Sequence, residues 1–156
     1  MEIIVTSVVA VVGTLLGSLA THYFQRRNRA DAERFERGER LRQERVSAYT
    51  TFGGALVNLR RVQIDRWFAE HHERGGDPEV LRYEAYRMRT SALEALFRVQ
   101  LVTESKDLIA LGQQAMDDID LLTSDLPAED LPSARDVAKS SIFRFVEAAR
   151  KHVEVA

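Results

Sequence analysis

The feature that most constrains this chain is a run of uncharged residues at its start. Residues 3–20 carry no charged side chain, and Arg26, Arg27 and Arg29 follow soon after. A helix rises about 1.5 Å per residue, so residues 3–24 would extend roughly 33 Å, and the hydrocarbon core of a bilayer is about 30 Å thick. The run therefore predicts a transmembrane helix over residues 1–24.

The three arginines predict how this span would be oriented. Basic residues next to a span stay in the cytoplasm, which places the N-terminus outside and the C-terminal domain in the cytoplasm. The expected location is thus a single pass through the cell membrane, with the lipid bilayer as a partner. A cleaved signal peptide is the alternative, because Ser18 and Ala20 are small enough for cleavage. Such a peptide has basic residues before its apolar part, however, and only Glu2 precedes this one.

Composition limits the chemistry that the chain can carry. The 156 residues include no cysteine, which excludes a disulfide framework, thiol catalysis and a cysteine-based zinc site. The net charge of −2 argues against a general nucleic-acid binder. The residues that follow the predicted span are about enough for one domain with a modest core.

Residues 25–45 have the composition of a charged helical stalk. Phe35 and Leu41 are their only large aliphatic or aromatic side chains, too few to bury a face against a core. Acid and base stand four residues apart, as at Glu36 and Arg40, and each such pair stabilises a helix by a few tenths of a kcal/mol.

Residues 46–156 show apolar residues at helical spacing almost throughout. The pattern predicts four helices, over about 45–74, 78–102, 105–122 and 132–153, with a loop over 123–133. Asp77 and Pro78 provide a cap and a first-turn proline for the second helix. The predicted core residues are Phe52, Leu96 and Phe145, and the aromatic residues expected to widen the apolar stripe of the second helix are Tyr83, Tyr86 and Phe97.

Helices with short connections pack most simply as an up-and-down bundle. The predicted fold class is therefore all-α, with an N-terminal transmembrane helix (1–24), a charged helical stalk (25–45) and an antiparallel helical bundle (46–156). No strand signal and no internal repeat is visible.

Two resemblances bear on this plan. The length, apolar start and arginine-rich stalk resemble the peripheral-stalk b subunit of ATP synthases, but Gly75 to Pro78 and the prolines near residue 130 would break its long helix. Arg45, Ala48, Tyr49 and Phe52 form an Arg-x-x-Ala-Tyr-x-x-Phe element. With the apolar start, this element resembles a loose group of uncharacterised, single-pass, membrane-anchored helical bacterial proteins with no established activity. That resemblance implies placement and no chemistry.

The chain departs from this group at Gly53 and Gly54, where stronger helix formers would be expected. Either a close helix crossing uses the missing side chains, or the helix is locally weak.

Motifs of catalysis are absent from the sequence. There is no glycine-rich phosphate loop, nucleophile elbow or His-x-x-x-His pair. His71 and His72 would point about 100° apart on a helix and are expected to cap its C-terminus. Asp117 and Asp120 share a face but lack the EF-hand spacing, so a solvated face is expected. We therefore expect no enzyme, no catalytic, cofactor-binding or metal-ligating residues, and no cofactor.

The remaining signal concerns association. Ala10, Gly13, Gly17 and Ala20 stand three and four residues apart, and small residues at this spacing let two helices approach closely in lipid. The pattern also arises by chance, so a homo-oligomer and a neutral face both stay open. Two functions are predicted. The first is a membrane-tethered helical interaction module that binds an unknown cytoplasmic protein partner. The alternative is a membrane-active, phage- or toxin-like effector that acts through an oligomerising span.

Overall fold

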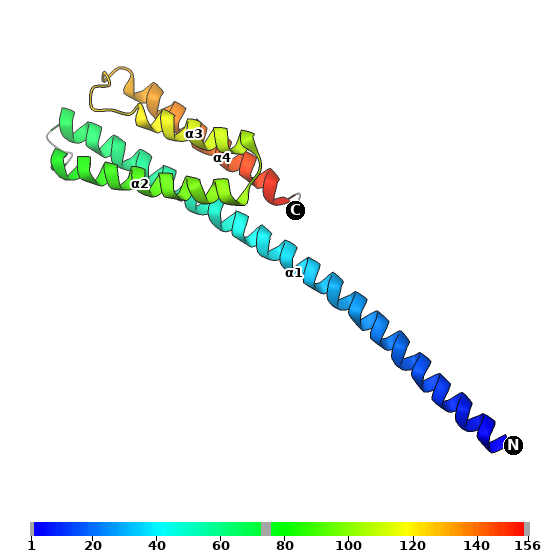
Figure 1. Ribbon diagram of the computed structural model, residues 1–156. Helices are drawn as coiled ribbons and strands as arrows, with labels where there is room; N and C mark the ends of the chain where they lie inside the picture. Colours follow the sequence, from blue (N-terminus) through cyan, green and yellow to red (C-terminus); the bar gives the residue numbers. More distant parts are fainter. Residues whose placement is uncertain (1, 73–75, 155–156) are drawn as a thin grey trace. The chain divides into compact units, whose positions relative to one another are not determined.

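The structure of the chain, a computed structural model, is all-α (Figure 1). It describes the backbone of residues 2–72 and 76–154 and the side chains of residues 35–72 and 76–153. Within these residues there are four helices: α1 (Glu2–His71), α2 (Pro78–Val102), α3 (Lys106–Asp120) and α4 (Leu131–Glu154). The chain divides into two compact units, Met1–Arg40 and Leu41–Ala156, and the helical bundle lies in the second.

The helix starts follow from local chemistry, as predicted. Asp77 caps α2, and its carboxylate accepts a hydrogen bond from the Glu79 amide at 2.9 Å, with Pro78 in the first turn. Ser105 caps α3 by accepting from the Leu108 amide at 3.2 Å. Gly76 precedes the α2 cap with φ +94°, a conformation that side-chain-bearing residues rarely adopt.

Hydrogen bonds between the helices fix an antiparallel order. Near one end of the bundle, Arg45 on α1 donates through Nε to the Val102 carbonyl at the end of α2, at 3.1 Å. Arg60, further along α1, donates to the Arg135 carbonyl at the start of α4. Since α3 also packs against α4, the four helices form the predicted up-and-down bundle.

The core contains the residues that the apolar spacing predicts. Phe52 on α1 and Phe145 on α4 are fully buried, with ring centroids 4.9 Å apart in an edge-to-face arrangement, and Leu96 on α2 is also buried. Gly112 on α3 lies against this cluster. A Cβ placed there would stand 3.0 Å from Cε1 of Phe52 and 3.1 Å from Cδ1 of Leu96, so α3 can come this close only because the side chain is missing.

The predicted transmembrane element requires correction. In the part of the chain whose side chains are described, no helix is sufficiently long and apolar to cross a bilayer. Each of these helices carries several charged residues, and each such residue would cost about 2.5 to 3.5 kcal/mol at the bilayer centre. The fold class is therefore corrected to an all-α helical bundle. The predicted single-pass location, with the N-terminus outside and the C-terminal domain in the cytoplasm, is corrected with it.

The residues singled out for that span are Ala10, Gly13, Gly17 and Ala20, followed by Arg26, Arg27 and Arg29. They belong to α1, but their side chains lie outside the described residues.

Candidate functional site

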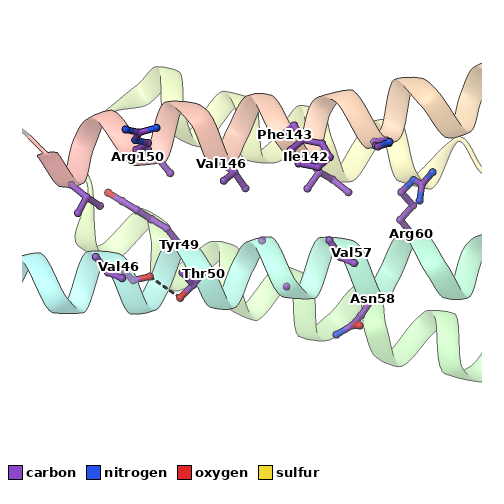
Figure 2. Close-up of a pocket in the computed structure, with 15 residues that line it drawn as sticks. Val46, Tyr49, Thr50, Val57, Asn58, Arg60, Ile142, Phe143, Val146 and Arg150 are labelled. Carbon is purple, nitrogen blue, oxygen red and sulfur yellow. Dashed lines mark hydrogen bonds between the residues drawn. The ribbon is translucent and has the colours of Figure 1, made fainter.

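A groove of about 780 Å³ runs between α1 and α4 (Figure 2). Figure 2 shows the residues of α1 on one side of it and those of α4 on the other. Its lining residues come from two segments: Val46, Tyr49, Thr50, Gly53, Gly54, Val57, Asn58 and Arg60 on α1, and Lys139, Ile142, Phe143, Val146, Ala149, Arg150 and Val153 on α4. The α1 segment covers fourteen residue steps, or roughly 21 Å of helix.

The glycine pair of α1 keeps this groove open. A Cβ on Gly53 would stand 3.6 Å from Cγ2 of Val146, an ordinary contact distance, and a Cβ on Gly54 would meet nothing within 4 Å. The pair therefore does not serve a close helix crossing, the first of the two predicted explanations. Each glycine costs the helix about 1 kcal/mol relative to alanine, yet α1 continues through both.

The walls of the groove are apolar and exposed. Phe143 on α4 is 62% exposed, and Val146 and Val57 are exposed beside it. The rings of Phe52 and Phe145 lie in the core behind these residues. The outer sides of the groove residues stay uncovered. Large apolar side chains gathered in this way on a protein surface indicate an interaction site.

Positive charge borders the apolar walls. Arg60, Lys139 and Arg150 line the groove, and none of the described lining residues is Asp or Glu. Arg60 donates from Nε and Nη2 to the Arg135 carbonyl at 3.3 and 3.1 Å. Burial, and then the neighbouring charge of Arg135, lower the pKa of the Arg60 guanidinium below its ordinary value, an effect that Asp136 opposes. The described lining therefore carries positive charge and no carboxylate.

Tyr49 carries a polar atom that the described residues leave unsatisfied. Its side chain is 5% exposed, and its hydroxyl has no hydrogen-bond partner. Figure 2 shows this hydroxyl between the two helices, toward the end of the groove where Arg150 lies. The neighbouring Thr50 differs, because its hydroxyl donates to the Val46 carbonyl at 2.8 Å. A buried hydroxyl without a partner costs about 1 to 3 kcal/mol.

A second polar cluster joins α3 to α4. Ser141 donates to Oδ2 of Asp118, Gln114 donates to Oδ1 of the same carboxylate at 2.8 Å, and Arg144 approaches it at 3.9 Å. Asp118 and Ser141 are both buried, whereas Asp117, on the face expected to be solvated, is exposed. No histidine takes part in this cluster of described side chains, and its hydrogen bonds link α3 to α4.

The histidines near the end of α1 pack on aromatic rings. His71 stacks on Trp67 with ring centroids 4.1 Å apart, and its Nδ1 lies 2.9 Å from the Trp67 carbonyl oxygen. The indole of Trp67 in turn donates to the Leu126 carbonyl at 2.9 Å, which ties the α3–α4 loop to α1. Across the described side chains, no three His, Cys, Asp or Glu residues are grouped to hold a metal ion.

Sequence reasoning missed the groove, although it noted Gly53 and Gly54. The stronger signal is a set of exposed residues on α1 that lie beside the buried stripe carrying Phe52, namely Val46, Gly54 and Val57. A second row of small and apolar residues of this kind indicates a face open to a partner.

Comparison with known proteins adds a family. Residues 46–153 match the family described as KilB plasmid transfer protein. The match includes every residue that lines the groove. No curated protein and no solved structure matches the chain.

Proposed function

Because the chain belongs to the KilB plasmid transfer protein family, we propose that it acts in plasmid transfer as a protein-binding module, and that the α1–α4 groove is where its partner binds. The observation that carries this proposal is the groove itself, an exposed apolar trough bordered by basic residues within the family match.

The lining supports binding rather than chemistry. Its polar side chains are a phenol, a hydroxyl, an amide and three basic groups, and the described lining offers no carboxylate or imidazole for proton transfer. Phe143 and Val146 instead present apolar area, which stabilises a complex when a partner removes it from water.

The shape supports a protein partner. Groove residues recur along α1 from Val46 to Arg60, roughly 21 Å, so the trough is about as long as four turns of helix. An elongated apolar trough between two helices suits a third helix, a common mode of recognition between proteins.

Substitution of Gly54 tests the proposal. Gly54→Leu places a large side chain in the open groove, and Gly38→Leu is the matched control, because a Cβ on Gly38 also meets nothing within 4 Å but Gly38 lies outside the groove. Both changes replace a helical glycine with a stronger helix former, so both proteins should fold.

The measurement is the transfer frequency of a plasmid that encodes the chain. We expect Gly54→Leu to lower it by about tenfold or more, which corresponds to a loss of at least about 1.4 kcal/mol of partner binding, while Gly38→Leu leaves it near the wild-type value. Normal transfer by Gly54→Leu, or an equal loss in both variants, would refute the groove as the partner site.

A further inference from the structure

The charge and length of the groove indicate the chemistry of the partner that it binds. We infer that the α1–α4 groove binds an amphipathic helix of another protein, one that carries an acidic side chain near each end of its apolar face. This inference rests on the proposed function and names the chemistry of the partner.

The apolar middle of the groove requires an apolar face on the bound helix. Phe143 and Val146 from α4 and Val57 from α1 border the trough, and Gly53 and Gly54 lie along its α1 side without side chains. A helix that lies along the trough can therefore approach the α1 backbone closely and place its own apolar residues between the two walls.

The basic residues of the groove determine where acidic side chains are expected on the bound helix. Lys139 and Arg150 lie on the same helix, eleven residues apart, which is roughly 16 Å of helix axis. Arg60 lies beside the start of α4, where it donates to the Arg135 carbonyl, so it adds to the charge at the Lys139 end. An occupant with acids about eleven residues apart on its bound face would place one at each end.

Arg150 sets the charge at the other end of the groove. It lines the groove there, so an acidic side chain of the bound helix would face a positive charge at this end.

The probe for this test is a synthetic helical peptide with Leu residues on one face and two Glu about eleven residues apart on that face. Its controls carry Lys in place of both Glu, or carry the two Glu on the opposite face. Binding of each labelled peptide to the full-length chain is followed by fluorescence anisotropy at low and moderate salt. We expect the first peptide to bind about tenfold more tightly than either control, and the advantage over the Lys peptide to shrink as salt rises.

Variants of the protein locate the effect. Lys139→Glu should remove the preference for Glu over Lys, whereas Lys151→Glu, an equal change of charge on the same helix outside the groove, should keep it.

The outcomes separate the inference from the proposed function. Equal affinity for the Glu and Lys peptides, or binding that survives Gly54→Leu, would overturn the inference, and so would self-association of the chain through the groove that Gly54→Leu abolishes. In each case a loss of plasmid transfer in Gly54→Leu would still support the groove as a functional site. Normal transfer in that variant would refute the proposed function, whatever the peptides do.

Discussion

Gly112 on α3 and Gly54 on α1 lie in two differently packed parts of the same bundle. At Gly112 an added Cβ would press against the buried Phe52 and Leu96 at 3.0 and 3.1 Å, whereas at Gly54 it would meet nothing within 4 Å. The first glycine allows helices to close on a core, and the second leaves a trough without a covering helix. The comparison shows that a glycine in a helix can serve packing or access, and that its surroundings decide which.

The largest loss of stability is expected from a truncation in the core, the closely packed part that contains Gly112. Phe52→Ala removes a fully buried ring that contacts Phe145, and such truncations cost about 3 to 5 kcal/mol of unfolding free energy. Denaturant unfolding followed by circular dichroism measures this loss. The same truncation at Phe143, in the wall of the groove, should cost much less because that ring is 62% exposed. Equal losses at the two positions would contradict the distinction between a packed core and an uncovered groove.

A smaller loss is expected when the close approach at Gly112 is filled. Gly112→Val would drive methyl groups into Phe52 and Leu96, and overpacking of this kind costs typically about 1 to 3 kcal/mol. The midpoint of urea unfolding, with the slope checked for constancy, reports the change. A variant as stable as the wild type would show that this crossing has room to spare.

The smallest change should have the opposite sign. Gly54→Ala adds a methyl group where there is open space and raises helix propensity, so it should stabilise the protein by about 0.5 to 1 kcal/mol. Differential scanning calorimetry of the wild type and the variant would detect the rise in Tm. A fall in Tm would mean that the space beside Gly54 is filled in solution.

Much of the bundle could be predicted because the signals are local. The cap at Asp77, the proline at position 78 and the cap at Ser105 act within a few residues of their own helices, and the structure places helix starts there. Phe52 and Phe145 stand in long periodic stripes, so their burial followed from spacing alone.

Features that depend on neighbouring helices could not be predicted in this way. Tyr83, Tyr86 and Phe97 were expected to widen the buried stripe of α2, but all three are exposed. The buried face of α2 is narrow and rich in small residues such as Ala92 and Ala95, and the described part of the chain leaves the flanks of this face exposed. The width of the buried stripe on a helix depends on how many other helices pack against it, and the sequence of that helix alone does not give this number.

The groove was out of reach for a related reason. The groove is defined by space that no part of the described bundle fills. The burial of Asp118 was equally hidden, because Ser141, which donates a hydrogen bond to its carboxylate, comes from another helix. Hydropathy along the chain gives each helix an apolar side but does not say which apolar residues remain uncovered.

The most direct test of the central claim, that a partner occupies the α1–α4 groove, is site-specific photo-crosslinking during plasmid transfer. A photoreactive amino acid would replace Phe143 in the groove or, as the control, Leu101 on α2, which is 85% exposed and lies outside it. We predict a discrete crosslinked product from position 143 that disappears in the Gly54→Leu background, and no such product from position 101. A product from position 101 alone, or one from position 143 that survives Gly54→Leu, would contradict the claim.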